Sequence, residues 1–262
     1  MTSSTSVLLA VEAGIATLTL KRPEVLNAFD AEMAEAFLAR IEEIAARDDV
    51  RVILLKGEGR GFCAGGDVSQ FTKGGDPQAA IKAIIDPLHE GLRRLDGLTQ
   101  PSVACLHSAV AGAGFSLALA CDLAVAAENA KFTLAYARIG ATPDGSGTYH
   151  LPRIVGMKKA KELALLADTI DAGEALRLGL VNRVVPPDML PAAATELARR
   201  LANGPTQAYG RVKGLLGSAG DRTLAEQLDA ERGAFMASAA TAGFSEGVAA
   251  FLDKRPPRFT GR

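Results

Sequence analysis

The feature that most constrains the fold of this chain is a series of short apolar strands separated by segments with helical spacing. The predicted strands lie at residues 50–57 (VRVILLKG), 102–110 (SVACLHSAV) and 121–127 (CDLAVAA). Strands that are apolar throughout are buried on both faces, and they occur mainly in parallel sheets whose crossover connections are helices. The sequence therefore predicts an α/β fold built around a parallel sheet.

The N-terminal part of the chain adds a hairpin and a helix. Residues 6–24 alternate apolar and polar side chains around Ala13-Gly14, which predicts two strands joined by a tight turn. Residues 30–49 then place apolar side chains at helical spacing behind Asp30, a residue type that suits the N-cap position. We therefore expect the order strand, strand, helix at the start of the chain.

The last third of the chain is predicted to be mostly helical. From Gly156 onward the spacing is that of helices, with breaks expected at Gly204-Pro205 and at Gly243. We found no internal repeat and no low-complexity linker. We expect an α/β core over residues 1–195, which would carry the ligand site, and a helical region over residues 196–262.

Charge and cysteine content exclude several classes of function. The chain has 262 residues, and its 29 Lys and Arg side chains nearly balance 30 Asp and Glu, so nothing favours binding to nucleic acid or to an anionic membrane. Cys63, Cys105 and Cys121 form no CxxC pair and are predicted to be buried thiols. The N-terminus lacks a basic region followed by an apolar stretch, and we expect a soluble, unprocessed protein of the cytoplasm.

Two glycine-rich loops each stand between a predicted strand and a predicted helix. They are residues 57–67 (GEGRGFCAGGD) and 109–114 (AVAGAG). Neither loop is a phosphate-binding motif: Leu117 stands where a dinucleotide fingerprint needs its third glycine, and no Gly-Lys-Ser/Thr is present. The glycines could simply mark tight turns and close packing. Alternatively, backbone amides from both loops could converge on one developing oxyanion.

At this point the chain resembles the enoyl-CoA hydratase/isomerase, or crotonase, superfamily. The resemblance covers essentially the whole chain in six segments: KRPEVLNAF, GFCAGGD, AVAGAGFSLALACDLAVAAENAKF, IGATPDGSGTYHLPRIVG, GEALRLGLVNRVV and EGVAAFLDKRPPRFTG. It implies a crotonase-like core of repeated ββα units, a helical C-terminal region used in trimerisation, and often hexamers. It also implies an acyl-CoA substrate, with coenzyme A entering as part of that substrate and no separate cofactor.

The resemblance also implies which residues bind the substrate. The backbone amides of Gly66 and Ala113 would hold the thioester oxygen. The other substrate-binding residues that it implies lie along the CoA arm, near the pantetheine and thioester, or in the second glycine loop: Glu24, Val25, Ala28, Ala64, Asp67, Val68 and Gly112. Asp67 is expected to act mainly as a helix cap. Lys254 would contact the CoA phosphate, even from a neighbouring subunit, or would be an ordinary solvated lysine.

The two glutamates of the family's hydratases are missing from this chain. Ser116 and Tyr136 stand at those positions and would line the pocket, but neither is a ready general base near neutral pH. His89, His107 and His150 have no Cys or carboxylate at ligand spacing, so we expect no metal site.

One acid remains in the right stretch, Asp144 in GATPDGSGTYH. From the residues alone, Pro-Asp-Gly predicts a turn in which Asp144 caps the following helix. The resemblance points instead to a catalytic carboxylate, because Asp144 stands where the ring-epoxide isomerases of phenylacetyl-CoA degradation and the chlorobenzoyl-CoA dehalogenases carry theirs. The dehalogenases also use a tryptophan, and this chain has none. We expect Asp144 to face the pocket among apolar neighbours such as Ile139 and Ala141.

The hypothesis from the sequence is an acyl-CoA isomerase. Asp144 would move a proton along an unsaturated or ring-modified acyl chain while the enolate oxygen rests on the amides of Gly66 and Ala113. Two alternatives stay open: an enoyl-CoA hydratase that adds water to a 2-enoyl-CoA, and a member that binds acyl-CoA without catalysis.

Overall fold

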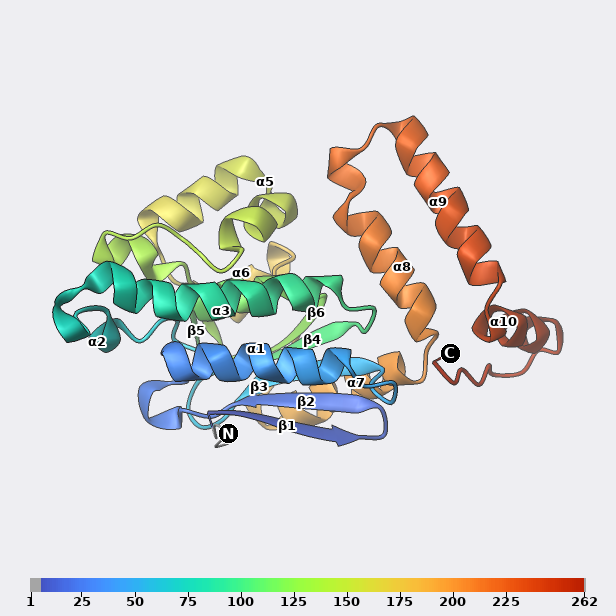
Figure 1. Ribbon diagram of the computed structural model, residues 1–262, viewed down its shortest axis with the longest axis horizontal. Coiled ribbons are helices and arrows are strands. Elements are labelled where there is room, and N and C mark those ends of the chain that lie inside the picture. The colour runs from blue at the N-terminus through green and yellow to red at the C-terminus, as the bar shows by residue number, and fades with distance from the viewer. Residues whose placement is uncertain (1–5, 262) are drawn as a thin grey trace.

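The computed structural model describes residues 6–261, and its centre is a six-stranded sheet in the order β1-β2-β3-β4-β6-β9 (Figure 1). These strands are β1 Val7–Glu12, β2 Ile15–Leu20, β3 Val52–Gly57, β4 Ser102–Leu106, β6 Leu123–Ala127 and β9 Arg183–Val185. Only the hairpin pair β1 and β2 is antiparallel within this described sheet; the other neighbours are parallel. The predictions of a hairpin and a parallel α/β sheet are confirmed.

A second, smaller sheet includes the start of the second glycine loop. It contains β5 Ala109–Ala111, β7 Lys131–Thr133 and β8 Ile170–Asp171. The chain passes from β4 through β5 into helix α4 (Ala113–Ala120), and from β6 through β7 toward helix α5 (Gly147–Leu166). Each step is strand, strand, helix, as expected for ββα units.

Helices cover both faces of the large sheet. On one face, α1 (Ala31–Ala45) and α3 (Pro77–Gly97) run side by side, and Figure 1 shows them crossing in front of the strands. On the other face, α7 (Leu190–Ala202) packs against alternate strand residues such as Val52 and Leu54. The intervening Ile53 and Leu55 belong to the main core, as the period of two in a strand requires.

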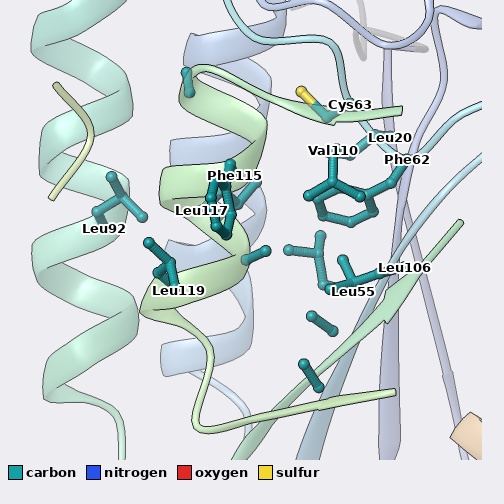
Figure 2. Close-up of a cluster of buried hydrophobic side chains, with 14 of the residues drawn as sticks. Leu20, Leu55, Phe62, Cys63, Leu92, Leu106, Val110, Phe115, Leu117 and Leu119 are labelled. Atoms are coloured by element: carbon teal, nitrogen blue, oxygen red, sulfur yellow. The ribbon is translucent and has the colours of Figure 1, made fainter. Parts of the chain in front are cut away.

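The apolar interior around α4 fixes the second glycine loop. Figure 2 shows Phe115, Leu117 and Leu119 of α4 between the sheet and α3. These three side chains are at most 5% exposed, and Phe115 also packs on the Phe132 ring, with centroids 5.5 Å apart. The helix is apolar on every side because it is surrounded on every side.

The C-terminal helices extend away from the core along the long axis of the molecule (Figure 1). The remaining helices of the described chain are α2 Val68–Phe71, α6 Ala172–Arg177, α8 Thr206–Gly217, α9 Leu224–Ala239 and α10 Ala242–Leu252. The predicted break at Gly204-Pro205 separates α7 from α8. The predicted break at Gly243 is wrong: Thr241 caps α10 by accepting a hydrogen bond from the Phe244 amide, which leaves Gly243 inside the helix.

Within residues 6–261, no single helix has the length and apolar character needed to cross a membrane. Only the sharply bent pair of α9 and α10 meets that requirement, and it does so by length and composition alone.

Candidate active site

The two glycine loops lie directly against one another. Cys63 forms a parallel bridge with Val110: the Cys63 amide donates to Ala109 O at 3.1 Å, and the Ala111 amide donates to Cys63 O at 2.9 Å. Figure 2 shows Cys63 and Val110 on these neighbouring segments. A Cβ added at Gly114 would stand 2.4 Å from Cys63 O, closer than any side chain can approach. Glycine at position 114 therefore allows the loops to touch.

The first loop turns the amide of Gly66 away from its neighbours. Phe29 and Gly66 form a parallel bridge in which the Phe29 amide donates to Gly65 O at 2.7 Å and the Asp67 amide donates to Phe29 O at 2.8 Å. Because Phe29 uses both residues that flank Gly66, the N–H of Gly66 itself points to the opposite side. Within residues 6–261, that amide has no hydrogen-bond acceptor.

The second loop exposes the amide of Ala113, the first residue of α4. Gly112 has φ 50° and ψ −126°, a conformation that favours glycine. Ala113 N has no acceptor in the described chain, as expected for a first-turn amide, and the helix dipole makes that amide attractive to negative charge. A Cβ added at Gly65 would lie 3.4 Å from Ala113 N, so the two loops meet at this amide. The arrangement can hold an oxyanion between two backbone donors.

Two side chains of the segment before α1 hold the first loop in place. Asn27 is fully buried, and its Nδ2 donates to the carbonyl oxygens of Gly61 at 2.8 Å and Phe62 at 3.1 Å. Nη2 of Arg22 lies 3.1 Å from Asp67 Oδ2, next to Gly66. We did not single out Asn27 or Arg22 from the sequence, although a polar Asn in the apolar stretch VLNAF was a usable signal.

The residues predicted along the CoA arm lie on the two segments that the bridge between Phe29 and Gly66 joins. Glu24 and Val25 lie in a 3-10 helix, Pro23–Val25, and Ala28 is buried. The Ala64 amide donates to Leu26 O at 2.9 Å, which ties the first glycine loop to that segment.

The remaining predicted binding residues differ in position and exposure. Asp67 caps α2 as predicted, accepting from the Ser69 amide at 3.2 Å, and Val68 is 51% exposed. Lys254 is exposed beyond α10, and Figure 1 places α10 at the opposite end of the molecule from α2. The structure therefore does not bring Lys254 to the other residues within one chain.

A cluster of polar side chains surrounds Asp144, which lies in the loop between a 3-10 helix, Ala135–Ile139, and α5. The Tyr136 hydroxyl donates to Asp144 Oδ1 at 2.5 Å, and the Ser116 hydroxyl donates to Asp144 O at 2.8 Å. Burial, together with the Asp144 carboxylate, raises the pKa of Tyr136, so this phenol stays protonated as a donor. A Cβ added at Gly112 would lie 4.0 Å from Tyr136 Cζ, so the cluster adjoins the second glycine loop.

The surroundings of Asp144 exclude the helix-cap alternative and correct the expectation that Ile139 and Ala141 bury its side chain. Asp144 does not cap α5: Ser146 occupies the N-cap position, and no side chain makes a capping hydrogen bond. Ile139 is 52% exposed and Ala141 is exposed, so among the described residues these two side chains do not bury Asp144 as expected. The side chains hydrogen-bonded to Asp144 are Tyr136 and Ser116, which carry hydroxyls.

His89 is a further neighbour of the Asp144 segment, and we had weighed it only as a metal ligand. It lies on α3, and its Nε2 accepts a hydrogen bond from the Gly145 amide at 3.1 Å and stands 3.9 Å from Asp144 Oδ2. Its distance from Asp144 in the sequence left no local signal. In the described part of the chain, no group of His, Cys, Asp or Glu side chains could hold a metal ion.

The cysteines of the described chain are free thiols and do not form a reactive site. Burial raises the pKa of Cys63 to about 12, of Cys105 to about 11 and of Cys121 to about 12. Cys63 Sγ lies 3.1 Å from Asn27 O, to which it donates. Cys63 is therefore a packing residue within the first glycine loop, consistent with its predicted burial.

The comparisons with known proteins agree with one another. A family model described as enoyl-CoA hydratase/isomerase matches residues 10–262. The chain is 40% identical over 259 residues to the 1,2-epoxyphenylacetyl-CoA isomerase of Escherichia coli, covering 96% of this chain and 97% of that protein. It is also 40% identical over 253 residues to a Rhodobacter capsulatus protein named "Probable enoyl-CoA hydratase", with 96% of each covered. A crystal structure of an enoyl-CoA hydratase from Polaromonas matches with a TM-score of 0.91 at 34% identity, covering 96% of this chain and 98% of that one.

Proposed function

The chain belongs to the enoyl-CoA hydratase/isomerase family, and we propose that within it this protein is an acyl-CoA isomerase with Asp144 as its acid/base. The observation that carries the proposal is the Asp144 cluster. Asp144 accepts a hydrogen bond from Tyr136, whose ring adjoins the second glycine loop, while Ser116 and Tyr136 stand where the family's hydratases carry glutamates. One carboxylate can move a proton between two carbons, whereas hydration must also activate a water molecule.

The oxyanion site comes first in the proposed mechanism. The thioester oxygen is held by the amides of Gly66 and Ala113, which are preorganised by the Phe29 bridge and by the start of α4. Removing a proton from the acyl chain places negative charge on that oxygen as an enolate. Each positioned donor can lower the barrier by roughly 3 to 4 kcal/mol.

The proton transfer is assigned to Asp144. Its carboxylate takes a proton from one carbon of the acyl chain, the enolate forms, and the same carboxylate returns the proton to another carbon. Tyr136 stays a donor throughout because its pKa is raised, so it orients the carboxylate without taking the proton. No cofactor is required, since coenzyme A is part of the substrate.

We propose an unsaturated or ring-modified acyl group as the substrate. Support comes from the Escherichia coli relative, whose name specifies 1,2-epoxyphenylacetyl-CoA. We place the protein in the cytoplasm, where the CoA thioesters that it would act on are found.

Assembly into trimers or hexamers is part of the proposal. Phe244 is 37% exposed, Val248 43% and Phe251 83%, so the described residues leave these apolar side chains of α10 uncovered. Contacts between subunits would bury these side chains and could bring Lys254 to the CoA of a neighbouring subunit. Sedimentation should show no stable monomer at micromolar concentration, and a stable monomer would contradict the assembly.

The experiment is the Asp144→Asn variant, assayed on a panel of 2-enoyl-CoA and 3-enoyl-CoA thioesters. We expect turnover to fall by about 100- to 10,000-fold, because the acid/base is lost. CoA affinity by calorimetry and the melting temperature should stay nearly unchanged, because Asp144 caps no helix. The surface variant Asp168→Asn is the matched control.

Three outcomes would count against the proposal. Full activity of Asp144→Asn on every thioester that the parent turns over would exclude the acid/base role. A hydroxyacyl-CoA product would establish a hydratase. Tight acyl-CoA binding by the parent protein without any turnover would establish a non-catalytic member.

A further inference from the structure

We propose that His89 is a positioning residue for Asp144, acting as a neutral imidazole that holds the adjacent Gly145 amide. The proposal rests on the proposed function of Asp144 as the acid/base. His89 would not exchange a proton with the substrate, and its effect on the reaction would pass through the backbone of the Asp144 loop.

The hydrogen bond at Gly145 fixes the form of the imidazole. The Gly145 amide lies 3.1 Å from His89 Nε2, and a backbone N–H can only donate. Nε2 must therefore carry its lone pair, which leaves the ring proton on Nδ1. In this form Nε2 cannot donate to Asp144 Oδ2, 3.9 Å away, so His89 bonds the amide rather than the carboxylate.

The segment that follows Asp144 needs such a restraint. Gly145 has φ 59° and Ser146 has φ 70°, so two consecutive residues lie in the left-handed region, the second of them not a glycine. Ser146 Oγ is buried and has no hydrogen-bond partner among the described residues. The Gly147 amide donates to Asp144 O at 3.2 Å, and side chains from other elements add to this local hydrogen bond in holding the left-handed backbone.

Three contacts from three different elements fix the loop. Tyr136 holds the Asp144 carboxylate, Ser116 of α4 holds its carbonyl, and His89 of α3 holds the next amide. Ser116 and His89 bond the two ends of one peptide unit, Ser116 its carbonyl oxygen and His89 its N–H. The His89 contact therefore completes the restraint on the plane of the peptide that follows Asp144.

Helix α3 is a rigid support for this contact. Leu88, Leu92 and Leu95 of α3 are at most 7% exposed, and Figure 2 shows Leu92 facing the α4 side chains Leu117 and Leu119. His89 precedes Leu92 by three residues and so lies on a neighbouring part of the same helix face. A Cβ added at Gly145 would lie 3.8 Å from Leu92 Cδ1, which places the loop against this face.

The test compares two replacements of His89 on the 3-enoyl-CoA panel. His89→Leu fills the space without an acceptor, and kcat should fall roughly 100-fold because the carboxylate is displaced. His89→Gln supplies an amide oxygen to Gly145, and kcat should return to within several-fold of the parent. KM and CoA affinity by calorimetry should change little in both variants. His150→Gln, at a residue that lines the same cavity of about 220 Å³ as His89, is the matched control and should behave as the parent.

Rescue by the conservative variant separates positioning from a purely structural role. Recovery of kcat in His89→Gln but not in His89→Leu, with KM unchanged in both, ties the effect to the acceptor that Gly145 needs. Melting temperatures of both variants establish that each is folded.

Other outcomes would overturn the inference without touching the proposed function. Equal, large losses in folded His89→Leu and His89→Gln would mean that His89 itself transfers a proton. Parent-like kcat in His89→Leu would mean that the Gly145 contact does not position Asp144. The proposed function fails separately, by full activity of Asp144→Asn.

Discussion

The two halves of the candidate site are built from different parts of the chain. The oxyanion half consists of main-chain amides at Gly66 and Ala113, and it exists because glycines on both loops leave room for close contact. The acid/base half consists of Asp144 and of three side chains, His89, Ser116 and Tyr136, that three other segments bring around its loop. The first half is a property of the local backbone, whereas the second depends on how distant elements pack.

This difference determines how each half should fail when it is changed. An added atom in the oxyanion half must displace backbone, so both loops move and stability falls together with activity. A removed atom in the acid/base half leaves the backbone in place, so activity should fall with little loss of stability. Three variants test that contrast, and they follow in order of expected effect.

Gly114→Ala should have the largest effect and break the oxyanion half. Its Cβ would stand 2.4 Å from Cys63 O, and that backbone oxygen cannot move without separating the loops. We expect turnover to fall by at least about 100-fold, as for loss of one oxyanion donor. The free energy of unfolding should fall by about 1 to 3 kcal/mol, the usual range for overpacking. Kinetics and chemical denaturation measure the two effects.

Gly214→Ala is the matched control for that variant. Gly214 lies in helix α8, and an added Cβ would meet nothing within 4 Å. Alanine should therefore leave activity unchanged and stabilise the helix by about 0.5 to 1 kcal/mol. A Gly114→Ala protein that matched Gly214→Ala in both measurements would show that close contact of the loops is not needed.

Tyr136→Phe should break the acid/base half with little effect on the fold. The phenylalanine keeps the ring but removes the donor to Asp144 Oδ1. A hydrogen bond to a charged group contributes about 1.5 to 3 kcal/mol, so we expect kcat to fall roughly 10- to 100-fold. The Asp144 side chain is 22% exposed, so water can replace the lost donor, and the free energy of unfolding should change by less than about 1 kcal/mol.

Tyr149→Phe is the control for the tyrosine variant, because Tyr149 is 45% exposed on α5 and makes no hydrogen bond to Asp144 within the described chain. It should keep parent activity. If Tyr136→Phe unfolded instead of losing turnover in the folded state, the acid/base half would fail in the same way as the oxyanion half. That result would contradict the proposed difference between the two halves.

Cys63→Ser should have the smallest effect on activity, although Cys63 lies beside the oxyanion loop. A serine hydroxyl can still donate to Asn27 O, so turnover should stay substantial. A folded Cys63→Ser protein without any turnover would contradict the assignment of the site to backbone amides.

The same variant should alter the dependence of stability on pH. The thiol titrates near pH 9 in the unfolded chain but near pH 12 in the native protein. Between these values the unfolded state binds fewer protons, so the free energy of unfolding falls as pH rises, by about 1.4 kcal/mol per unit for each such thiol. Cys63→Ser removes one of these thiols. Denaturation curves between pH 9 and 11 should therefore show a free energy of unfolding that falls less steeply, by about 1.4 kcal/mol per pH unit.

The same contrast explains what the sequence could and could not predict. The Asp30 cap, the glycine loops and most strands follow local rules of burial, capping and backbone freedom, and the structure has them where they were expected. The predicted strand at residues 102–110 is instead two strands, β4 and β5, in different sheets, because the chain turns at Ser108, which has φ 48°. The contact between His89 and Gly145 joins residues 56 positions apart, and no local pattern encodes it.

The errors have the same cause. Ile139 and Ala141 were expected around Asp144 because they are its neighbours in sequence, whereas the fold places Tyr136 and Ser116 there. Gly243 was expected to break a helix, but the capping hydroxyl of Thr241 starts α10 two residues earlier. Helix ends and side-chain clusters depend on competing partners that a single stretch of sequence does not rank.

The central claim is that this site moves a proton without adding water. The most direct test is the mass of the product that the parent protein forms from 3-enoyl-CoA and 2-enoyl-CoA thioesters in water enriched in heavy oxygen. The account predicts a product with a shifted double bond, the same elemental composition as the substrate and no heavy oxygen. A hydroxyacyl-CoA product that carries heavy oxygen would contradict it and identify the site as a hydratase.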